Sequence, residues 1–181
     1  MRKSRKKYLY VTIATLFCAA IFAVIVYYSV RNVGFPRPYR DVVEKSGLDE
    51  TLVYAVMKAE SGFEEESFSS AGAVGLMQLM PATAEFVCRM NGLEYEFERL
   101  TDGEYNTRLG CLYLAYLLRR FECIDTTLAA YNAGEGTVTE WLKNSEYSLD
   151  GKTLKNIPYE ETARYVKKVE KFRKIYQFFY H

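Results

Sequence analysis

Glu60 is the acidic residue whose sequence surroundings best suit proton transfer. On the helix predicted around it, the residues that share its face are apolar, namely Leu52, Val53, Val56 and Met57. A carboxylic acid that closes an apolar stripe sits in a low dielectric, which raises its pKa toward that of a general acid. The alternative is structural: Glu60 reaches water at the helix end or pairs with a buried arginine. The pattern makes Glu60 a candidate and leaves both explanations open.

Gln78 is the polar exception in a segment of small and apolar residues. Residues 69–84 read Ser-Ser-Ala-Gly-Ala-Val-Gly-Leu-Met-Gln-Leu-Met-Pro-Ala-Thr-Ala, and the glycines let backbone approach a ligand closely. The Gln78 amide needs a partner in such a segment, either protein backbone or a hydroxyl or amide of a substrate. The sequence does not decide between bracing of the loop and ligand binding.

Tyr131 and Asn132 form a second candidate pair, just before Gly134. An aromatic ring suits the apolar face of a sugar, and an amide suits an acetamido group. Taken alone, the commoner explanation is a core tyrosine beside an asparagine helix cap.

The numbers of histidines and cysteines limit the kinds of catalytic site that this chain can form. The one histidine is His181, which argues against Ser/His/Asp triads, Cys/His dyads and histidine-based zinc sites, and no metal or organic cofactor is implied. Three cysteines outside the apolar N-terminal run, Cys88, Cys111 and Cys123, argue against a complete disulfide framework. Cys111 is expected to be a buried free thiol, and a single bridge is left open. Carboxylates, hydroxyls and amides remain.

The N-terminal region predicts a membrane anchor. Residues 1–7 are a basic tail, and the 23 residues 8–30 carry no charge, enough for a helix to cross a hydrocarbon core of about 30 Å. A cleaved signal peptide shares the basic start, but its apolar run is usually shorter and ends in a small-residue cleavage site. We therefore expect an uncleaved single-pass anchor in the cell membrane, with a cytoplasmic N-terminus.

Residues 31–39 are expected to form a short extended stem because Pro36 and Pro38 resist helix, and residues 40–181 to form one domain outside the membrane, close to the bilayer. Five of the 24 Lys and Arg residues lie in the basic tail, so acids outnumber bases in the rest of the chain. That balance argues against nucleic acid as a partner.

The domain is predicted to be all-helical or α+β. Caps, prolines and glycines place helices at about 49–61, 81–91, 106–121, 125–133 and 137–143, and a last helix after Pro158. The run Cys111–Leu118 is apolar all round, which marks a central buried helix. Lysines and Arg173 follow along the last helix, a pattern more typical of a solvated face than of contact with anionic wall polymer or lipid headgroups.

In combination, several segments closely resemble the soluble lytic transglycosylases, enzymes that cleave peptidoglycan. The resemblance covers about residues 40–175. It is carried, in order, by Glu60-Ser61, residues 72–84, residues 106–114, residues 130–134 and residues 161–166. It implies the lysozyme-like fold, mainly α with a small β element, and peptidoglycan glycan strands as the substrate.

The resemblance also implies roles for individual residues. Glu60 matches the family's catalytic acid, and Ser61 its usual neighbour. The residues matching those that line the glycan cleft or close the site are Ser69, Gln78, Met80, Tyr131, Asn132, Glu161 and Tyr165. One departure is visible after Phe63, where Glu64-Glu65 replaces a frequent Asn-Pro, which affects loop shape more than the acid.

The implied reaction uses one carboxylic acid as acid and then as base. It cleaves the MurNAc-β-1,4-GlcNAc bond and leaves a 1,6-anhydro-MurNAc end without consuming water. Two alternatives stay open: a hydrolytic muramidase of the same fold, with Glu161 as second carboxylate, or a catalytically silent glycan-binding scaffold in a cell-envelope assembly.

Overall fold

A computed structural model describes residues 2–180 of the chain. They fall into two units that meet between Pro38 and Tyr39, and each is described by itself. The division follows the contacts within the chain, which are dense inside each unit.

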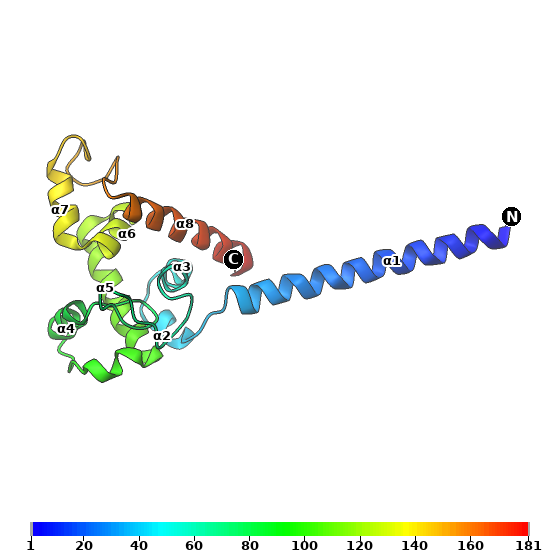
Figure 1. The fold of residues 1–181 in the computed structure, drawn as a ribbon, viewed down its shortest axis with the longest axis horizontal. Coiled ribbons are helices and arrows are strands. Elements are labelled where there is room, and N and C mark those ends of the chain that lie inside the picture. Colours follow the sequence, from blue (N-terminus) through cyan, green and yellow to red (C-terminus); the bar gives the residue numbers. More distant parts are fainter. Residues whose placement is uncertain (1, 181) are drawn as a thin grey trace. The chain divides into compact units, whose positions relative to one another are not determined.

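The N-terminal unit is a long helix, α1 (Arg2–Ser29), followed by a π-helical turn, η1 (Val30–Gly34) (Figure 1). The stretch Thr12–Gly34 is long and apolar enough to cross a membrane. The extended stem expected from residue 31 is wrong for residues 31–34, which are helical. A proline restricts only itself and the residue before it, so Phe35, before Pro36, is the first to leave the helix, with φ −134° and ψ 62°.

The second unit is helical, as expected for a lysozyme-like fold (Figure 1). Its elements are α2 (Arg40–Lys45), α3 (Glu50–Glu60), α4 (Pro81–Met90), the 3₁₀-helix η2 (Phe97–Thr101), α5 (Gly103–Phe121), α6 (Ile124–Ala133), α7 (Glu135–Lys143) and α8 (Glu160–Tyr180). Its extended structure within residues 2–180 consists of two isolated bridges, Phe68 with Val74 and Val74 with Leu79. The mainly α prediction is confirmed; α2 and η2 were not predicted.

Side-chain caps set where two of the helices begin. Asp49 accepts a hydrogen bond from the Thr51 amide at 2.9 Å and starts α3, as predicted. Asp102 accepts from the Glu104 amide at 2.9 Å, so α5 begins at Gly103, three residues before its expected start.

The core of the second unit forms where α3 packs along α8 and where α5 contacts α2, α4, η2 and α6. Tyr54 of α3 stacks on Tyr176 of α8 with ring centroids 5.6 Å apart, and both rings are fully buried. The buried α5 confirms the central helix expected from its apolar run. Cys111 on this helix is a buried free thiol, as expected, and Cys88 and Cys123 are also free.

Asn106 holds the loop between α3 and α4 against α5. Its side chain is fully buried, and its Nδ2 donates to the carbonyls of Val74 at 2.9 Å and Leu100 at 2.8 Å. Its Oδ1 accepts from the Met77 amide at 2.8 Å. Gly75 lies against this amide with φ +81°, where a Cβ would collide with Asn106 and the Leu100 carbonyl. The loop is therefore fixed by a buried polar contact that only glycine accommodates.

Replacing this amide should cost more stability than replacing a surface asparagine. Asn106→Ala leaves the Met77 amide and the Leu100 carbonyl without partners, while the Val74 carbonyl keeps only the Leu79 amide, and we expect the free energy of unfolding to fall by about 3 kcal/mol. Asn91→Ala, which removes a single hydrogen bond from an exposed residue to the Val87 carbonyl, should cost about 1 kcal/mol or less. Urea denaturation of both variants checks this, and equal losses would contradict the assigned role of Asn106.

Candidate functional site

Glu60 ends α3 where that helix meets α8. Burial raises the pKa of its carboxyl group from the usual 4.5 to about 7, because the charged form is deprived of water. The Tyr165 hydroxyl of α8 donates a hydrogen bond of 2.7 Å to Glu60 Oε1, which lowers this pKa but does not outweigh burial. Among residues 2–180 no arginine forms an ion pair with Glu60. The arginine-pair explanation therefore does not fit. The carboxyl group is half-buried, so it loses much of its water but keeps some access to solvent at the helix end.

Lys168, one helical turn after Tyr165, is the cation nearest to this carboxyl group. Its Nζ donates at 2.7 Å to the carbonyl of Ala59, the residue before Glu60. Its positive charge lowers the pKa of Glu60. Lys168 thus fixes the end of α3 and partly offsets the effect of burial, so Glu60 can hold a proton near neutral pH and can also release it.

Tyr131, at the end of α6, lies close enough to Glu60 to feel its charge. It is buried, and its hydroxyl donates at 2.8 Å to the carbonyl of Met77 in the braced loop. Burial, followed by the negative charge of Glu60, raises the Tyr131 pKa well above its usual value. Burial does the same for Tyr165, so both phenols stay neutral hydrogen-bond donors.

Gln78 braces the loop. Its backbone is left-handed, with φ +47°, and its Nε2 donates to the carbonyls of Gly75 at 2.8 Å and Ser67 at 3.2 Å. Of the two explanations the sequence left open, the structure shows backbone partners for the amide nitrogen. A role of the half-buried Gln78 in ligand binding would use the carboxamide oxygen.

Two predicted serines also act within the loop. The Ser61 hydroxyl donates to the Leu76 carbonyl at 2.8 Å and accepts from the Phe63 amide at 3.0 Å, which ties the end of α3 to the loop. Ser69 Oγ accepts from the Ala73 amide at 2.9 Å. Met80 lies at the start of α4 with an exposed side chain. Only Met80 of these three presents a largely uncovered side chain.

Asn132 joins α6 to α8 through its side chain. Its Oδ1 accepts a hydrogen bond of 2.8 Å from the hydroxyl of Thr162. The side chain is exposed, and its amide nitrogen has no hydrogen-bond partner within residues 2–180. This fixed, outward-facing donor is suited to an acceptor such as an acetamido carbonyl.

Glu161 does not join the group around Glu60. It is exposed on the first turn of α8, and the groups that shift the Glu60 pKa are burial, Tyr165 and Lys168, with no second carboxylate among them. The structure therefore brings together Glu60, Tyr165 and Tyr131, with Asn132 nearby on α6, and leaves Glu161 apart.

Sequence reasoning missed Lys168, Thr162 and Asn106. The first two were detectable in part, because Thr162, Tyr165 and Lys168 recur every three residues and so share one face of a helix. Asn106 carried no such signal, since its partners lie 6 to 32 positions away. For metal ions, the described part of the chain holds no group of three His, Cys, Asp or Glu side chains placed for coordination.

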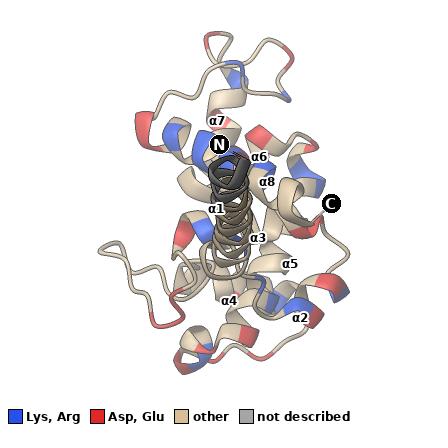
Figure 2. Cartoon of the chain, turned by 90° about the vertical axis from the view of Figure 1, so that its right-hand side faces the viewer, with Lys and Arg blue, Asp and Glu red and all other residues tan. Residues whose placement is uncertain are grey.

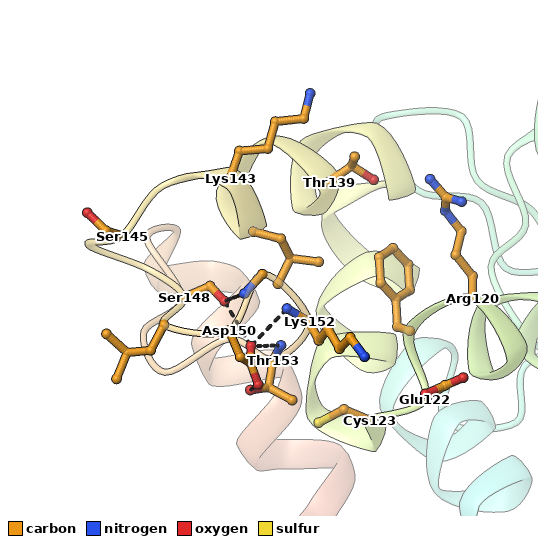
Figure 3. Close-up of a pocket in the computed structure, with 14 residues that line it drawn as sticks. Arg120, Glu122, Cys123, Thr139, Lys143, Ser145, Ser148, Asp150, Lys152 and Thr153 are labelled. Atoms are coloured by element: carbon orange, nitrogen blue, oxygen red, sulfur yellow. Dashed lines mark hydrogen bonds between the residues drawn. The ribbon is translucent and has the colours of Figure 1, made fainter.

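A separate hollow of about 1040 Å³ lies between the end of α5, α7 and the loop that follows α7 (Figure 3). None of the predicted site residues lines it. Two acids line it, Glu122 and Asp150. Asp150 is engaged by its own loop: it accepts from the backbone amides of Thr153 at 2.7 Å and Lys152 at 2.8 Å, which holds its pKa far below the usual value. We therefore assign the hollow no part in the candidate site.

The raised pKa of Glu60 has a measurable effect on stability. Because folded Glu60 keeps its proton to a higher pH than unfolded Glu60, the free energy of unfolding should fall as pH rises from about 4.5 to about 7, by about 3 kcal/mol. Glu60→Gln cannot ionise, so its stability relative to the native chain should grow over that window and stay constant above it. The exposed Glu64→Gln is the matched control and should show no such trend. A constant difference between native and Glu60→Gln from pH 4 to 8 would refute the assignment.

The chain is similar in sequence to a known protein family and to several of its members. The family described as Transglycosylase SLT domain matches residues 39–154. The soluble lytic murein transglycosylase of Escherichia coli (strain K12) is 35% identical over 153 residues, which cover 80% of this chain and 24% of the relative. The membrane-bound lytic murein transglycosylase C of Histophilus somni (strain 2336) is 29% identical over 161 residues, covering 76% of this chain and 44% of the relative.

A solved structure shows the same fold. The crystal structure of the 70 kDa soluble lytic transglycosylase of Escherichia coli has a TM-score of 0.71 and 34% identity, with 80% of this chain and 25% of that chain covered. The chain thus spans about a quarter of the length of the soluble relatives. With the domain matched over residues 39–154 and the fold shared, the chain belongs to the SLT-domain transglycosylase family.

Proposed function

We propose that this protein is a membrane-anchored peptidoglycan lytic transglycosylase that cleaves the MurNAc-β-1,4-GlcNAc bond and leaves 1,6-anhydro-MurNAc ends. The observation that carries the proposal is a single half-buried carboxyl group, Glu60, whose pKa is raised to about 7. Glycosidases that use water or a covalent intermediate employ two carboxylates that flank the bond. One acid without a neighbouring carboxylate fits a reaction in which the substrate supplies the nucleophile.

In the first step, protonated Glu60 gives its proton to the glycosidic oxygen as the bond from that oxygen to C1 of MurNAc breaks. In the second, the Glu60 carboxylate takes the proton of the MurNAc C6 hydroxyl while O6 bonds to C1. The proton that Glu60 lost is thereby restored, and no water is consumed. An internal hydroxyl has a very high effective concentration at C1, which favours ring closure over hydrolysis.

The neighbours of Glu60 suit both steps. Burial favours the protonated form needed first, while the Tyr165 hydrogen bond and the Lys168 charge favour the carboxylate needed second. Asn132, at the end of α6, would present a free amide N–H to the sugar, next to the buried Tyr131. The loop between α3 and α4 would form one wall of the cleft. It is braced by Ser61, Ser69 and Gln78, and Met80 borders it. Glu161 would lie at the rim of the cleft.

The proposal places residues 1–7 in the cytoplasm, 8–30 in the membrane, 31–39 as a stem and the catalytic domain 40–181 on the cell-wall side. It is supported by the apolar segment Thr12–Gly34, by the five basic residues before residue 8 and by the membrane-bound relative. An anchored enzyme of this class would cut glycan strands near the membrane surface.

Replacing the acid should abolish cleavage while leaving the fold intact. We expect Glu60→Gln, in the full chain in detergent, to release soluble muropeptides from purified peptidoglycan at least about a thousandfold more slowly than the native chain. Glu64→Gln should retain native activity. Mass spectrometry should show native products one water lighter than reducing muropeptides.

The products also separate the alternatives. Reducing products would identify a hydrolase, and Glu161→Gln would then show whether Glu161 is its second carboxylate. Glycan binding without cleavage by the folded native chain would identify a scaffold. Unchanged cleavage by Glu60→Gln would reject the site.

The charge at Lys168 should set the upper pH limit of activity. Lys168→Met removes a charge that lowers the Glu60 pKa, so the alkaline limb of the kcat/KM profile should move to higher pH. Lys168→Arg should keep the native limb, as should Lys167→Met, which changes an exposed neighbour. A limb that moves to lower pH, or moves equally in Lys167→Met, would contradict this role.

A further inference from the structure

A row of basic side chains ending in an aromatic ring runs along the exposed side of α8. Lys167, Lys171, Lys174 and Phe178 lie at spacings of four, three and four residues, which places them on one side of the helix. All four are exposed, and the Phe178 side chain is 74% accessible to solvent. We call these four residues the α8 basic patch.

The three lysines of the patch are not neutralised by neighbouring acids. Within residues 2–180, none of them forms an ion pair. Two of the three acids on α8 pair with arginines, Glu160 with Arg164 at 2.5 Å and Glu170 with Arg173 at 3.4 Å, while the third, Glu161, forms no ion pair within residues 2–180 and lies six positions before Lys167. In Figure 2, where Lys and Arg are blue and Asp and Glu red, α8 carries segments of both colours. The patch is therefore a local concentration of positive charge on a domain in which acids outnumber bases.

The positive charges and the exposed phenylalanine together restrict the class of partner that the patch can bind. Lysines beside an exposed phenylalanine are typical of surfaces that meet anionic lipid headgroups, where the charges stay at the headgroups and the ring enters the interface. A soluble anionic polymer would be met by the lysines alone and would leave the Phe178 ring, which contacts Phe179 but is largely exposed, uncovered. The exposed Phe178 therefore favours a lipid surface.

The patch ends near the point where the chain enters the domain. Tyr180, two residues beyond Phe178, stacks on Tyr176, and Tyr176 stacks on Tyr54, with ring centroids 5.9 and 5.6 Å apart. Tyr54 lies on α3, which contacts α2, the helix at the start of the domain. Residues 35–38 connect the end of η1 at Gly34 to Tyr39, the first residue of the domain. Fully extended, these four residues reach about 14 Å. In an anchored protein that distance holds this end of the domain near the headgroups.

We propose that the α8 basic patch docks on the anionic headgroups of the membrane that holds the anchor, an inference that rests on the anchoring proposed above. Docking would orient the domain as well as tether it. Tyr165, which contacts Glu60, precedes Phe178 by 13 residues, about 20 Å along the helix. The patch would thus set how far from the bilayer the cleavage site stands.

A single tryptophan at the patch tests the proposal in the full chain. Trp141 is the one tryptophan of the sequence, so in a Trp141→Phe background Phe178→Trp provides a unique probe, and Leu149→Trp provides a matched one on an exposed loop after α7. Both proteins are reconstituted in phosphatidylcholine vesicles with or without 30% phosphatidylglycerol, with brominated lipids as quenchers. We expect strong quenching at position 178 with phosphatidylglycerol and little at position 149.

Removing the lysines should release the probe. In the Phe178→Trp protein, Lys167→Gln, Lys171→Gln and Lys174→Gln together should weaken docking about a hundredfold, at about fivefold per lysine, and 0.5 M salt should act in the same direction. Thermal unfolding checks that the triple variant folds.

Three results would overturn the proposal: no quenching at position 178, equal quenching at both positions, or quenching that does not depend on phosphatidylglycerol. A response of the position 178 probe to soluble polyglycerol phosphate, without quenching by vesicles, would assign the patch to wall polymer. Flotation of the vesicles reports separately on the anchor, and muropeptide release on the reaction, so failure of either is distinguishable from failure of docking.

Discussion

The removal of water from Glu60 is the physical constraint on which the remainder of the site depends. Without burial, this carboxyl group would titrate near 4.5 and be ionised at neutral pH. The apolar face of α3 and the packing of α8 against it supply the burial, while Tyr165 and Lys168 keep the pKa from rising further. The fold therefore sets one proton affinity through opposing effects, of which burial is the largest.

The groups that make this adjustment come from segments far apart in the chain. The hydrogen bond from Tyr165 to Glu60 spans 105 positions, and that from Tyr131 to Met77 spans 54. The aromatic stack of Tyr54 on Tyr176 holds the same two helices together at their other end. Because α3 and α8 carry both the core and the acid, loss of their packing would destabilise the domain and expose Glu60 to water at once.

Much of the fold could be predicted because its signals are local. Asp49 and Pro81 mark helix starts by chemistry that acts within one turn, whereas α2 follows Tyr39, a left-handed residue with no side-chain cap, and gives no such signal. Glu60 could be singled out from its apolar neighbours on α3. The hydrogen bonds of Tyr165 and Lys168 to α3 could not be predicted from the sequence, because they depend on how two helices that are distant in the chain pack together. Gln78 stayed ambiguous because an amide that braces a loop and one that binds a ligand occupy the same kind of sequence.

The most direct test of this account is a titration of the Glu60 carboxyl group itself. Carbon-13 NMR of the side-chain carboxyl carbons, with Glu60→Gln to identify the signal, measures its pKa in the folded protein. The account predicts titration near 7, with the signal of a protonated acid persisting well above pH 5. Titration near 4.5 would show that water reaches Glu60, and would remove the basis for its action as both acid and base.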